Sequence, residues 1–131
     1  MVGRTHEYYV KLVEEDYFGS VTGQDKGAIL DCFTEDARVT IYHGDNKPRC
    51  FRGKPTSGES PISIFFDHLL GNYDPRFEDF THFVDAVHDR CAAHFRVHLT
   101  PKLDSPYLPV GVLVLQNCNF FLCRDGKIDD M

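Results

Sequence analysis

The sequence predicts an α+β fold in one domain, with helices gathered on one face of a mixed or antiparallel sheet. The chain has 131 residues, which suits a single hydrophobic core. Helical patterns occupy residues 5–33 and 60–72, and strand patterns follow each of these stretches. Helices and strands that cluster in separate runs are typical of α+β proteins rather than doubly wound ones. We therefore treat residues 1–131 as a single domain.

The first two helices have caps that can be read from the sequence. Thr5 can cap the first helix, whose apolar residues recur at three- and four-residue steps before Gly19 and Gly23. Asp25 can cap a shorter second helix that closes at residues 34–36. The apolar stripe of the first helix consists of Tyr9, Leu12, Val13 and Tyr17, and the second helix carries Ala28, Ile29, Cys32 and Phe33.

The third helix is expected to begin at Pro61, directly after Ser60, and to end at Gly71 and Asn72. Proline suits the first helical position because its missing N–H would be unpaired there in any case. The wide apolar face of this helix predicts that it is largely buried. That face consists of Ile62, Ile64, Phe65, Phe66, Leu69 and Leu70.

The remaining elements are predicted as strands. They are residues 37–42, 76–87, 92–100 and 110–123, with short strands near residues 50–52 and at Ile128. In residues 92–100 apolar and polar side chains alternate, which predicts one buried face and one outer face. The apolar set is Phe95, Val97 and Leu99, and the polar set is His94, Arg96 and His98. Residues 110–123 are largely apolar on both faces, which favours a central or interface strand.

Charge and composition exclude several classes of function. The net charge is −6 and no basic run is present, which argues against a nucleic-acid partner. The sequence has no run of about 18 apolar residues and no apolar core of a secretory signal at its N-terminus, so we expect no membrane partner and a cytoplasmic location. The five cysteines form no Cys-x-x-Cys motif, so we expect free thiols. Neither a metal nor a cofactor is expected.

Several segments carry a resemblance to a known family, and they lie in order along nearly the whole chain. They are residues 25–39, 51–54 and 62–66, together with the final turn at residues 124–128. These segments resemble the SnoaL-like and ketosteroid-isomerase-like members of the nuclear transport factor two superfamily. The resemblance implies a strongly curved sheet wrapped around three helices, which forms a cone-shaped, cystatin-like roll with an internal pocket for a small, often apolar ligand. It also implies a homodimer that forms through the sheet.

The resemblance indicates three positions for catalytic groups. At one of these positions the side chain of this protein has the required functional group. Tyr17 falls where the ketosteroid isomerases carry their oxyanion-hole tyrosine, and a buried phenol can donate a hydrogen bond to a developing enolate. The alternative is an ordinary core tyrosine. The catalytic base falls at Ile41 and the second acid at Cys118, and neither side chain supplies the required group. Steroid isomerisation by that mechanism is therefore not expected.

Other positions on the same strands are candidates for ligand contacts. If the resemblance holds, Ile41, Gln116 and Cys118 face the pocket. The Gln116 amide can then donate a hydrogen bond to a ligand oxygen. Asn117 and Asn119 then lie on the opposite face, where a dimer interface can satisfy their amides.

Two of the seven histidines are candidates for proton transfer, because imidazole titrates near pH 7. His43 shares the face of Ile41 and lies where the strand meets a loop, although it can equally be a solvated residue. His82 lies where SnoaL-like dehydratases often carry a histidine on the pocket side, although it can also be a core or interface residue. Asp85 is three residues away and thus on the opposite face, so any acid that pairs with His82 must come from another strand. His94 and His98 lie too far apart along one strand for a single metal ion to bridge them, at roughly 13 Å.

Two classes of function follow from these observations. The first is a cofactor-independent lyase or isomerase of the dehydratase type, acting on a small hydrophobic, oxygenated metabolite. In this hypothesis Tyr17 polarises the substrate and His82 or His43 moves protons. The second is a non-catalytic ligand-binding, adaptor or structural subunit of the same fold, which the residues at Ile41 and Cys118 favour.

Overall fold

The computed structural model of the chain describes residues 4–131. Its helices are α1 (His6–Val10), η1 (Lys11–Phe18), α2 (Gly19–Thr22), α3 (Lys26–Asp31) and α4 (Ile62–Asn72). Its strands are β1 (Phe33–Ile41), β2 (Arg49–Arg52), β3 (Ser60–Pro61), β4 (Tyr73–Asp85), β5 (Arg90–Pro101), β6 (Leu113–Arg124) and β7 (Lys127–Asp130). Two short 3₁₀ turns follow β4 and precede β6, at Ala86–His88 and Leu108–Val110.

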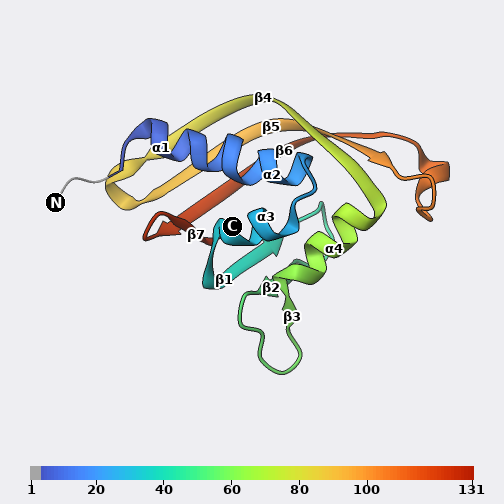
Figure 1. Ribbon diagram of the computed structural model, residues 1–131, viewed down its shortest axis with the longest axis horizontal. Coiled ribbons are helices and arrows are strands. Elements are labelled where there is room, and N and C mark those ends of the chain that lie inside the picture. The colour runs from blue at the N-terminus through green and yellow to red at the C-terminus, as the bar shows by residue number, and fades with distance from the viewer. Residues whose placement is uncertain (1–3) are drawn as a thin grey trace.

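The strands form one mixed sheet that curves around the helices. Its order is β3-β2-β1-β7-β6-β5-β4, with parallel pairing between β1 and β7 and antiparallel pairing along β7, β6, β5 and β4. The helices α1, α2 and α3 lie under the arch formed by β4, β5 and β6, and α4 leads up into β4 (Figure 1). This arrangement confirms the expected α+β class and the curved, unclosed sheet around three helical segments.

The expected helix starts are confirmed at two of the three positions. Thr5 accepts a hydrogen bond from the backbone N–H of Tyr8 at 3.2 Å, and Asp25 accepts one from that of Ala28 at 3.1 Å. The first helix is continuous from α1 through α2, and its middle part, η1, is wound as a π-helix. Gly19 lies inside this helix, so the helix ends later than its first glycine predicts.

The remaining boundaries differ from the sequence pattern for identifiable reasons. Ser60 and Pro61 are extended because they pair with β2, so α4 begins one residue later at Ile62. Strand β1 begins at Phe33, four residues before the expected Ala37, because its first half pairs with β7. The sequence pattern underestimated β1 because that partner lies far away in the chain.

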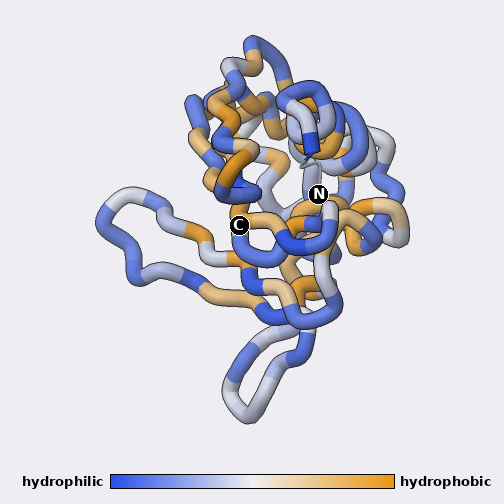
Figure 2. Tube along the Cα trace, turned by 90° about the vertical axis from the view of Figure 1, so that its left-hand side faces the viewer, coloured by the Kyte–Doolittle hydropathy of each residue, from blue (hydrophilic) through white to orange (hydrophobic). Residues whose placement is uncertain are grey.

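Gly53, in one of the segments that resemble the family, permits a close approach between β1 and the loop after β2. Its N–H donates to the Ala37 carbonyl at 2.7 Å, and a Cβ at this position would lie 2.3 Å from the Glu35 carbonyl oxygen. Only glycine fits such a contact. The loop between β2 and β3 then projects below the body in both views and is mostly hydrophilic or neutral (Figures 1 and 2).

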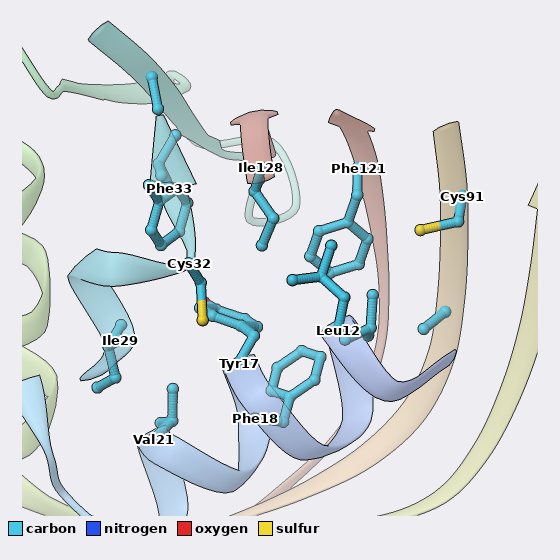
Figure 3. Close-up of a cluster of buried hydrophobic side chains, with 14 of the residues drawn as sticks. Leu12, Tyr17, Phe18, Val21, Ile29, Cys32, Phe33, Cys91, Phe121 and Ile128 are labelled. Atoms are coloured by element: carbon cyan, nitrogen blue, oxygen red, sulfur yellow. The ribbon is translucent and has the colours of Figure 1, made fainter. Parts of the chain in front are cut away.

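The core lies between the helices and the concave face of the sheet (Figure 3). Residues from the first helix, α3, α4 and every long strand contribute to it. Its largest fully buried side chains are Tyr9, Phe66, Phe95, Phe121, Ile29, Ile128, Val13, Val21 and Val39. Phe95 and Val97 are buried whereas His94 is exposed, which confirms the expected two faces of β5.

The N-terminal helix is fixed to one end of the sheet by two hydroxyl groups. The Tyr9 hydroxyl donates to the Asp89 carboxylate at 2.6 Å, and the Tyr8 hydroxyl donates to the Gly126 carbonyl at 2.7 Å. Burial, together with the neighbouring Asp89 carboxylate, raises the pKa of Tyr9 far above its usual range. These bonds join the helix to both hairpin turns at this end, which we call the closed end.

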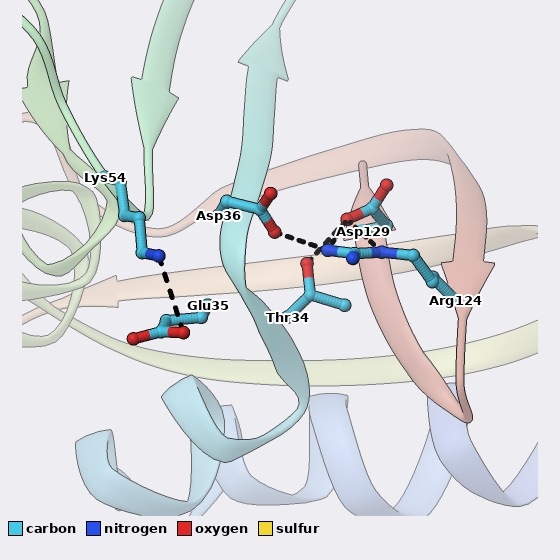
Figure 4. A network of polar contacts seen from close by, with 6 residues as sticks. All are labelled: Thr34, Glu35, Asp36, Lys54, Arg124 and Asp129. Carbon is cyan, nitrogen blue, oxygen red and sulfur yellow. Dashed lines mark hydrogen bonds and ion pairs between the residues drawn. The ribbon is translucent and has the colours of Figure 1, made fainter.

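Ionic contacts hold the β6–β7 hairpin against β1 (Figure 4). The Arg124 guanidinium pairs with the Asp36 and Asp129 carboxylates, and the Thr34 hydroxyl donates to Asp129 at 2.6 Å. These hydrogen bonds, that from Thr34 above all, lower the pKa of Asp129. The short strand β7 therefore links the two halves of the sheet through side chains as well as backbone.

Candidate functional site

Tyr17 projects from η1 into the aromatic core. Its ring lies at 5.7 Å from that of Phe33, 6.2 Å from Phe66 and 6.1 Å from Phe121, measured between centroids. Figure 3 shows it beside the thiol of Cys32. Burial raises the pKa of Tyr17 far above its usual range, and burial raises that of Cys32 to about 11. Both groups therefore stay protonated at neutral pH, and Tyr17 can act only as a neutral hydrogen-bond donor or acceptor.

The hydroxyl of Tyr17 lies in the buried core without a polar partner among the described residues. Among the described residues, none accepts or donates a hydrogen bond at this hydroxyl, and no fully buried side-chain oxygen or nitrogen lacks a partner. Only 3% of the residue is exposed. A polar group in this setting is available to a small ligand.

The inner face of β6 carries two further polar groups, Asn117 and Asn119. Phe121 on this strand is buried in the core, and the alternation of side chains places both asparagines on the same inward face. Both are half-buried. Gln116, which precedes Asn117, and Cys118, which lies between the two asparagines, are exposed. The amide of Asn119 donates a weak bond to the Met131 sulfur at 3.8 Å, and that of Asn117 bonds to no described residue.

The expected orientation of β6 was therefore wrong. Gln116 and Cys118 lie on the outer, exposed face of the sheet, and Asn117 and Asn119 take the inward positions. The reason is the packing of Phe121 against Tyr17, which fixes the face of every second residue along the strand. A contact between Gln116 or Cys118 and a ligand inside the cone does not fit this geometry.

The interior near β1 is apolar. Ile41 is half-buried and packs against the core together with Phe51 and Met131, so its expected inward orientation agrees with the structure. The other inward residues of β1 are Ala37 and Val39, both fully buried. No inward position of β1 supplies a carboxylate or imidazole for proton transfer.

His82 lies on the inward face of β4, with 13% of its side chain exposed. Its ring stacks on Phe80 at 5.7 Å, and its Nε2 lies 3.3 Å from Oε1 of Glu14 on η1. The acidic partner thus comes from the helix, whereas the sequence pattern led us to expect one from a neighbouring strand. A His–Glu pair of this kind can hold and move a proton.

The three residues expected to be catalytic do not meet in one site. Phe18 and Phe80 separate Tyr17 from His82, with successive ring centroids 4.6, 5.5 and 5.7 Å apart. His43 lies beyond the end of β1 in an exposed turn, where its carbonyl accepts a bond from Asn46. Their catalytic roles stay predictions.

Two hollows lie away from Tyr17. One, of about 430 Å³, lies at the ends of β4, β5 and β6 beside the exposed rings of Phe83 and Phe120. The other, of about 270 Å³, lies between α3, β1 and α4, next to Gly53. Neither hollow is lined by His43, His82 or Tyr17.

Within residues 4–131, no three His, Cys, Asp or Glu side chains are close enough together to hold a metal ion. None of the helices in this part of the chain is both long and apolar enough to cross a membrane.

The sequence analysis missed the roles of two kinds of residue. Asn117 and Asn119 were assigned to the wrong face. If the large Phe121 is taken as buried, the two-residue alternation along the strand places both asparagines on the inner face as well. Glu14 was not considered, because nothing in a linear pattern brings η1 next to His82, 68 positions along the chain.

No protein-family model matches the chain, and no curated protein matches its sequence. Solved structures do resemble its fold. A putative polyketide cyclase from Pseudomonas putida KT2440 superposes with a TM-score of 0.70 and 24% identity, over 91% of this chain and 84% of that one. The epoxide hydrolase/cyclase-like enzyme SalBIII of salinomycin pyran-ring formation superposes with a TM-score of 0.72 and 19% identity, over 95% of this chain and 87% of that one. An NTF2-like protein from Burkholderia xenovorans LB400 superposes with a TM-score of 0.68 and 13% identity, over 98% of this chain and 88% of that one.

These similarities show the fold. The curved sheet and the helices that it encloses are arranged as in proteins of NTF2-like and cystatin-like fold. The curved sheet around three helical segments, which the sequence resemblance implies, is therefore confirmed. Identities below 25% leave the activity to be argued from the chain's own residues.

Proposed function

We propose that this NTF2-like domain binds a small, mainly hydrophobic molecule that carries an oxygen, in the concave interior between β6 and the first helix. The observation that carries the proposal is the pair of half-buried amides of Asn117 and Asn119 on an otherwise apolar inner face. Asn117 bonds to no described residue, so its amide is available to bond a ligand oxygen.

The chemistry of the interior selects the ligand class. The polar groups that β6 offers there are two neutral amides, which suit a carbonyl or hydroxyl oxygen better than a charged group. The surrounding side chains of Leu113, Leu115 and Ile41 are apolar and half-buried, so they leave part of the inner face open to solvent. A ligand with one oxygen and an aliphatic or aromatic body matches both features.

Ligand binding can be tested by titrating a panel of small ketones, lactones and hydroxyketones and following amide chemical shifts by NMR. We expect perturbations at Asn117, Asn119 and Tyr17 for the compounds that bind. Replacing Asn117→Ala should weaken binding about tenfold, because one hydrogen bond to an enclosed oxygen is lost. The matched control is Gln116→Ala, one residue away on the outer face. Equal loss in both variants, or no binding at all across the panel, contradicts the proposal.

The second candidate is a cofactor-independent lyase or isomerase of the dehydratase type. Two observations favour it: the His82–Glu14 pair at 3.3 Å, and the names of two structural neighbours, a putative polyketide cyclase and an epoxide hydrolase/cyclase-like enzyme. Tyr17 would polarise a carbonyl oxygen and His82 would transfer the proton. The aromatic layer between them makes binding without turnover the better-supported proposal.

Turnover on hydroxylated ketones separates the two candidates. For an enzyme, His82→Asn and Glu14→Gln should each lower kcat at least tenfold while ligand binding persists. The control is His88→Asn, because His88 also pairs with a carboxylate, Asp85 at 2.9 Å, but on the surface. No turnover above background with any compound that binds contradicts the catalytic candidate and leaves the binding proposal standing.

A cytoplasmic location and a homodimer formed through the sheet belong to the same proposal. Both follow from the sequence and its resemblance, and light scattering of the purified protein together with fractionation of cells tests them directly.

A further inference from the structure

Two cysteines share the inner face of the sheet at its closed end. Cys91 of β5 is buried in the core, and Cys123 of β6 is half-buried and packs against the same core. In the register of the two strands Cys91 lies opposite Phe121, so Cys123 occupies the next inward position along β6. The N–H of Cys123 donates to the Asp89 carbonyl at 2.9 Å, which holds the two chain segments together at this level. The two cysteines are therefore diagonal neighbours on adjacent strands.

The two thiols are in contact with each other. The sulfur of Cys91 points toward the strand that carries Phe121 (Figure 3), and the Cys123 thiol donates a hydrogen bond to it. This hydrogen bond lowers the pKa of Cys91 and raises that of Cys123. The thiolate form of Cys91 is thus favoured, and the thiolate is the form that attacks oxidants and disulfides.

The other three cysteines have no such arrangement. Cys32 follows α3, where its thiol donates to the Ala28 carbonyl at 3.4 Å, and burial raises its pKa to about 11. Cys50 is exposed on β2, and Cys118 is exposed on the outer face of β6. The fold therefore brings one pair of thiols together and keeps the remaining three on other elements or on the opposite face.

We propose that Cys91 and Cys123 form a reversible redox site, in which a hydroperoxide converts the two thiols into one disulfide. The cross-link lies inside a single chain, and it goes beyond the proposed ligand binding because it needs neither a ligand nor Asn117.

The reaction has two steps. The Cys91 sulfur attacks an oxygen of the hydroperoxide, the O–O bond breaks, and the products are a sulfenic acid on Cys91 and water or an alcohol. The Cys123 sulfur then attacks the sulfenyl sulfur, an S–S bond forms, and the S–O bond breaks to release water. Two electrons pass from the thiols to the hydroperoxide, which is the oxidant in this reaction.

The position of the pair favours a bond that can be reduced again. Diagonal neighbours lie farther apart than the ideal spacing for a disulfide, so the bond draws the two strands together and carries strain. Strained disulfides are the more easily reduced ones, and they are typical of regulatory rather than structural sites.

Oxidation at this site acts on the anchor of the first helix. Cys91 lies two residues after Asp89, which binds the Tyr9 hydroxyl, and Cys123 lies three residues before Gly126, which binds the Tyr8 hydroxyl. A bond between the two cysteines joins the bases of both turns. The closed end is therefore stiffer in the oxidised protein than in the reduced one.

The test uses the full chain with the two exposed thiols removed, Cys50→Ser with Cys118→Ser, which prevents links between molecules. The folded protein is treated with hydrogen peroxide, its remaining thiols are blocked with N-ethylmaleimide, and its peptides are identified by mass spectrometry. We expect a link between residues 91 and 123, lighter than the two thiols by two hydrogen atoms, and an alkylated Cys32. Dithiothreitol should reverse the link. The thermal unfolding midpoint should rise by at least about 4 °C on oxidation, because the bond closes a loop of the unfolded chain.

Two further substitutions in this background test the roles of the thiols. Cys123→Ala should abolish the link and leave a sulfenic acid on Cys91, which dimedone captures. Cys32→Ala is the matched control, because it removes another buried thiol and should leave the link intact. Unfolding midpoints of the reduced variants establish that they fold.

A comparison with unfolded protein needs no substitution in the site. In urea that unfolds the chain, the same oxidant should give links among all three remaining thiols, because the loops that these links close differ little in entropy. Folded protein that gives this same mixture, or that loses its thiols to sulfinic acids without a link, overturns the proposal. A link that persists in Cys123→Ala also overturns it.

Discussion

The two halves of β6 differ in how they are held. At the closed end, Phe121 is fully buried, and the adjoining turns are fixed by Tyr9, Asp89 and Gly126. In the other half, Leu113 to Asn119, the inward side chains are only half-buried, and β7 does not extend along the strand among the described residues. One strand thus serves as core at one end and as an accessible surface at the other. Stability should reside at the closed end and binding at the open end.

The largest effect should come from the closed end. Phe121→Ala removes a buried ring that packs on Tyr17 and Phe18, and should lower the free energy of unfolding by about 3–5 kcal/mol. Urea denaturation measures this change. Phe83→Ala is the matched control, because that ring is 59% exposed, and it should change stability by less than about 0.5 kcal/mol. A small effect at Phe121 would show that the closed end is not where stability resides.

The helix anchor should give the next largest effect. Tyr9→Phe removes the hydroxyl that bonds to the Asp89 carboxylate at 2.6 Å, and should cost about 1.5–3 kcal/mol, as for hydrogen bonds to charged groups. Hydrogen exchange should also speed up in α1. Tyr42→Phe serves as the control, since Tyr42 is 77% exposed and belongs to neither turn. If both variants unfold at the same urea concentration, the anchor contributes nothing.

Acid should loosen the hairpin that joins the two halves of the sheet. The pKa of Asp129 is lower in the folded protein than in the unfolded chain, because Thr34 and Arg124 bond to its ionised form. Its contribution is therefore complete above the unfolded value of about 3.9 and is lost as the pH falls through the lower, folded value. The unfolding midpoint measured from pH 6 to pH 2 should drop more steeply for the wild type than for Asp129→Asn. Parallel curves would contradict this assignment.

The smallest effect on stability should come from the open end. Asn117→Ala should change the free energy of unfolding by less than about 0.5 kcal/mol, because its amide bonds to no described residue and is half-buried. The same change should weaken ligand binding, as proposed above. A loss of stability comparable to that of Phe121→Ala would place Asn117 in the core and remove the contrast between the halves.

The helices and the fold class were predictable because their signals are local. Thr5 and Asp25 cap their helices as the sequence indicates, and the alternation in β5 correctly separates Phe95 from His94. Such signals depend on neighbours a few residues away, and so they survive folding unchanged.

The candidate site could not be predicted as well, because its signals are not local. In β6 both alternating sets contain apolar residues, such as Leu115 and Val114, so period-two alternation assigns neither set to the inside. The contact between Phe121 and Tyr17 decides the face, and it joins residues from the two ends of the chain. The pairing of Glu14 with His82 likewise depends on how the helix lies across β4.

The bulge at Asp79 has a consequence for what can pair with the edge of the sheet at β4. A sheet with two free long edges can add copies at both, and it then grows without limit into a filament. Here the proline of β4, Pro75, the charges of Arg76, Glu78 and Asp79, and the bulge oppose the addition of a further strand at that edge. Growth into a filament by strand addition is therefore opposed at β4 by the chain's own sequence.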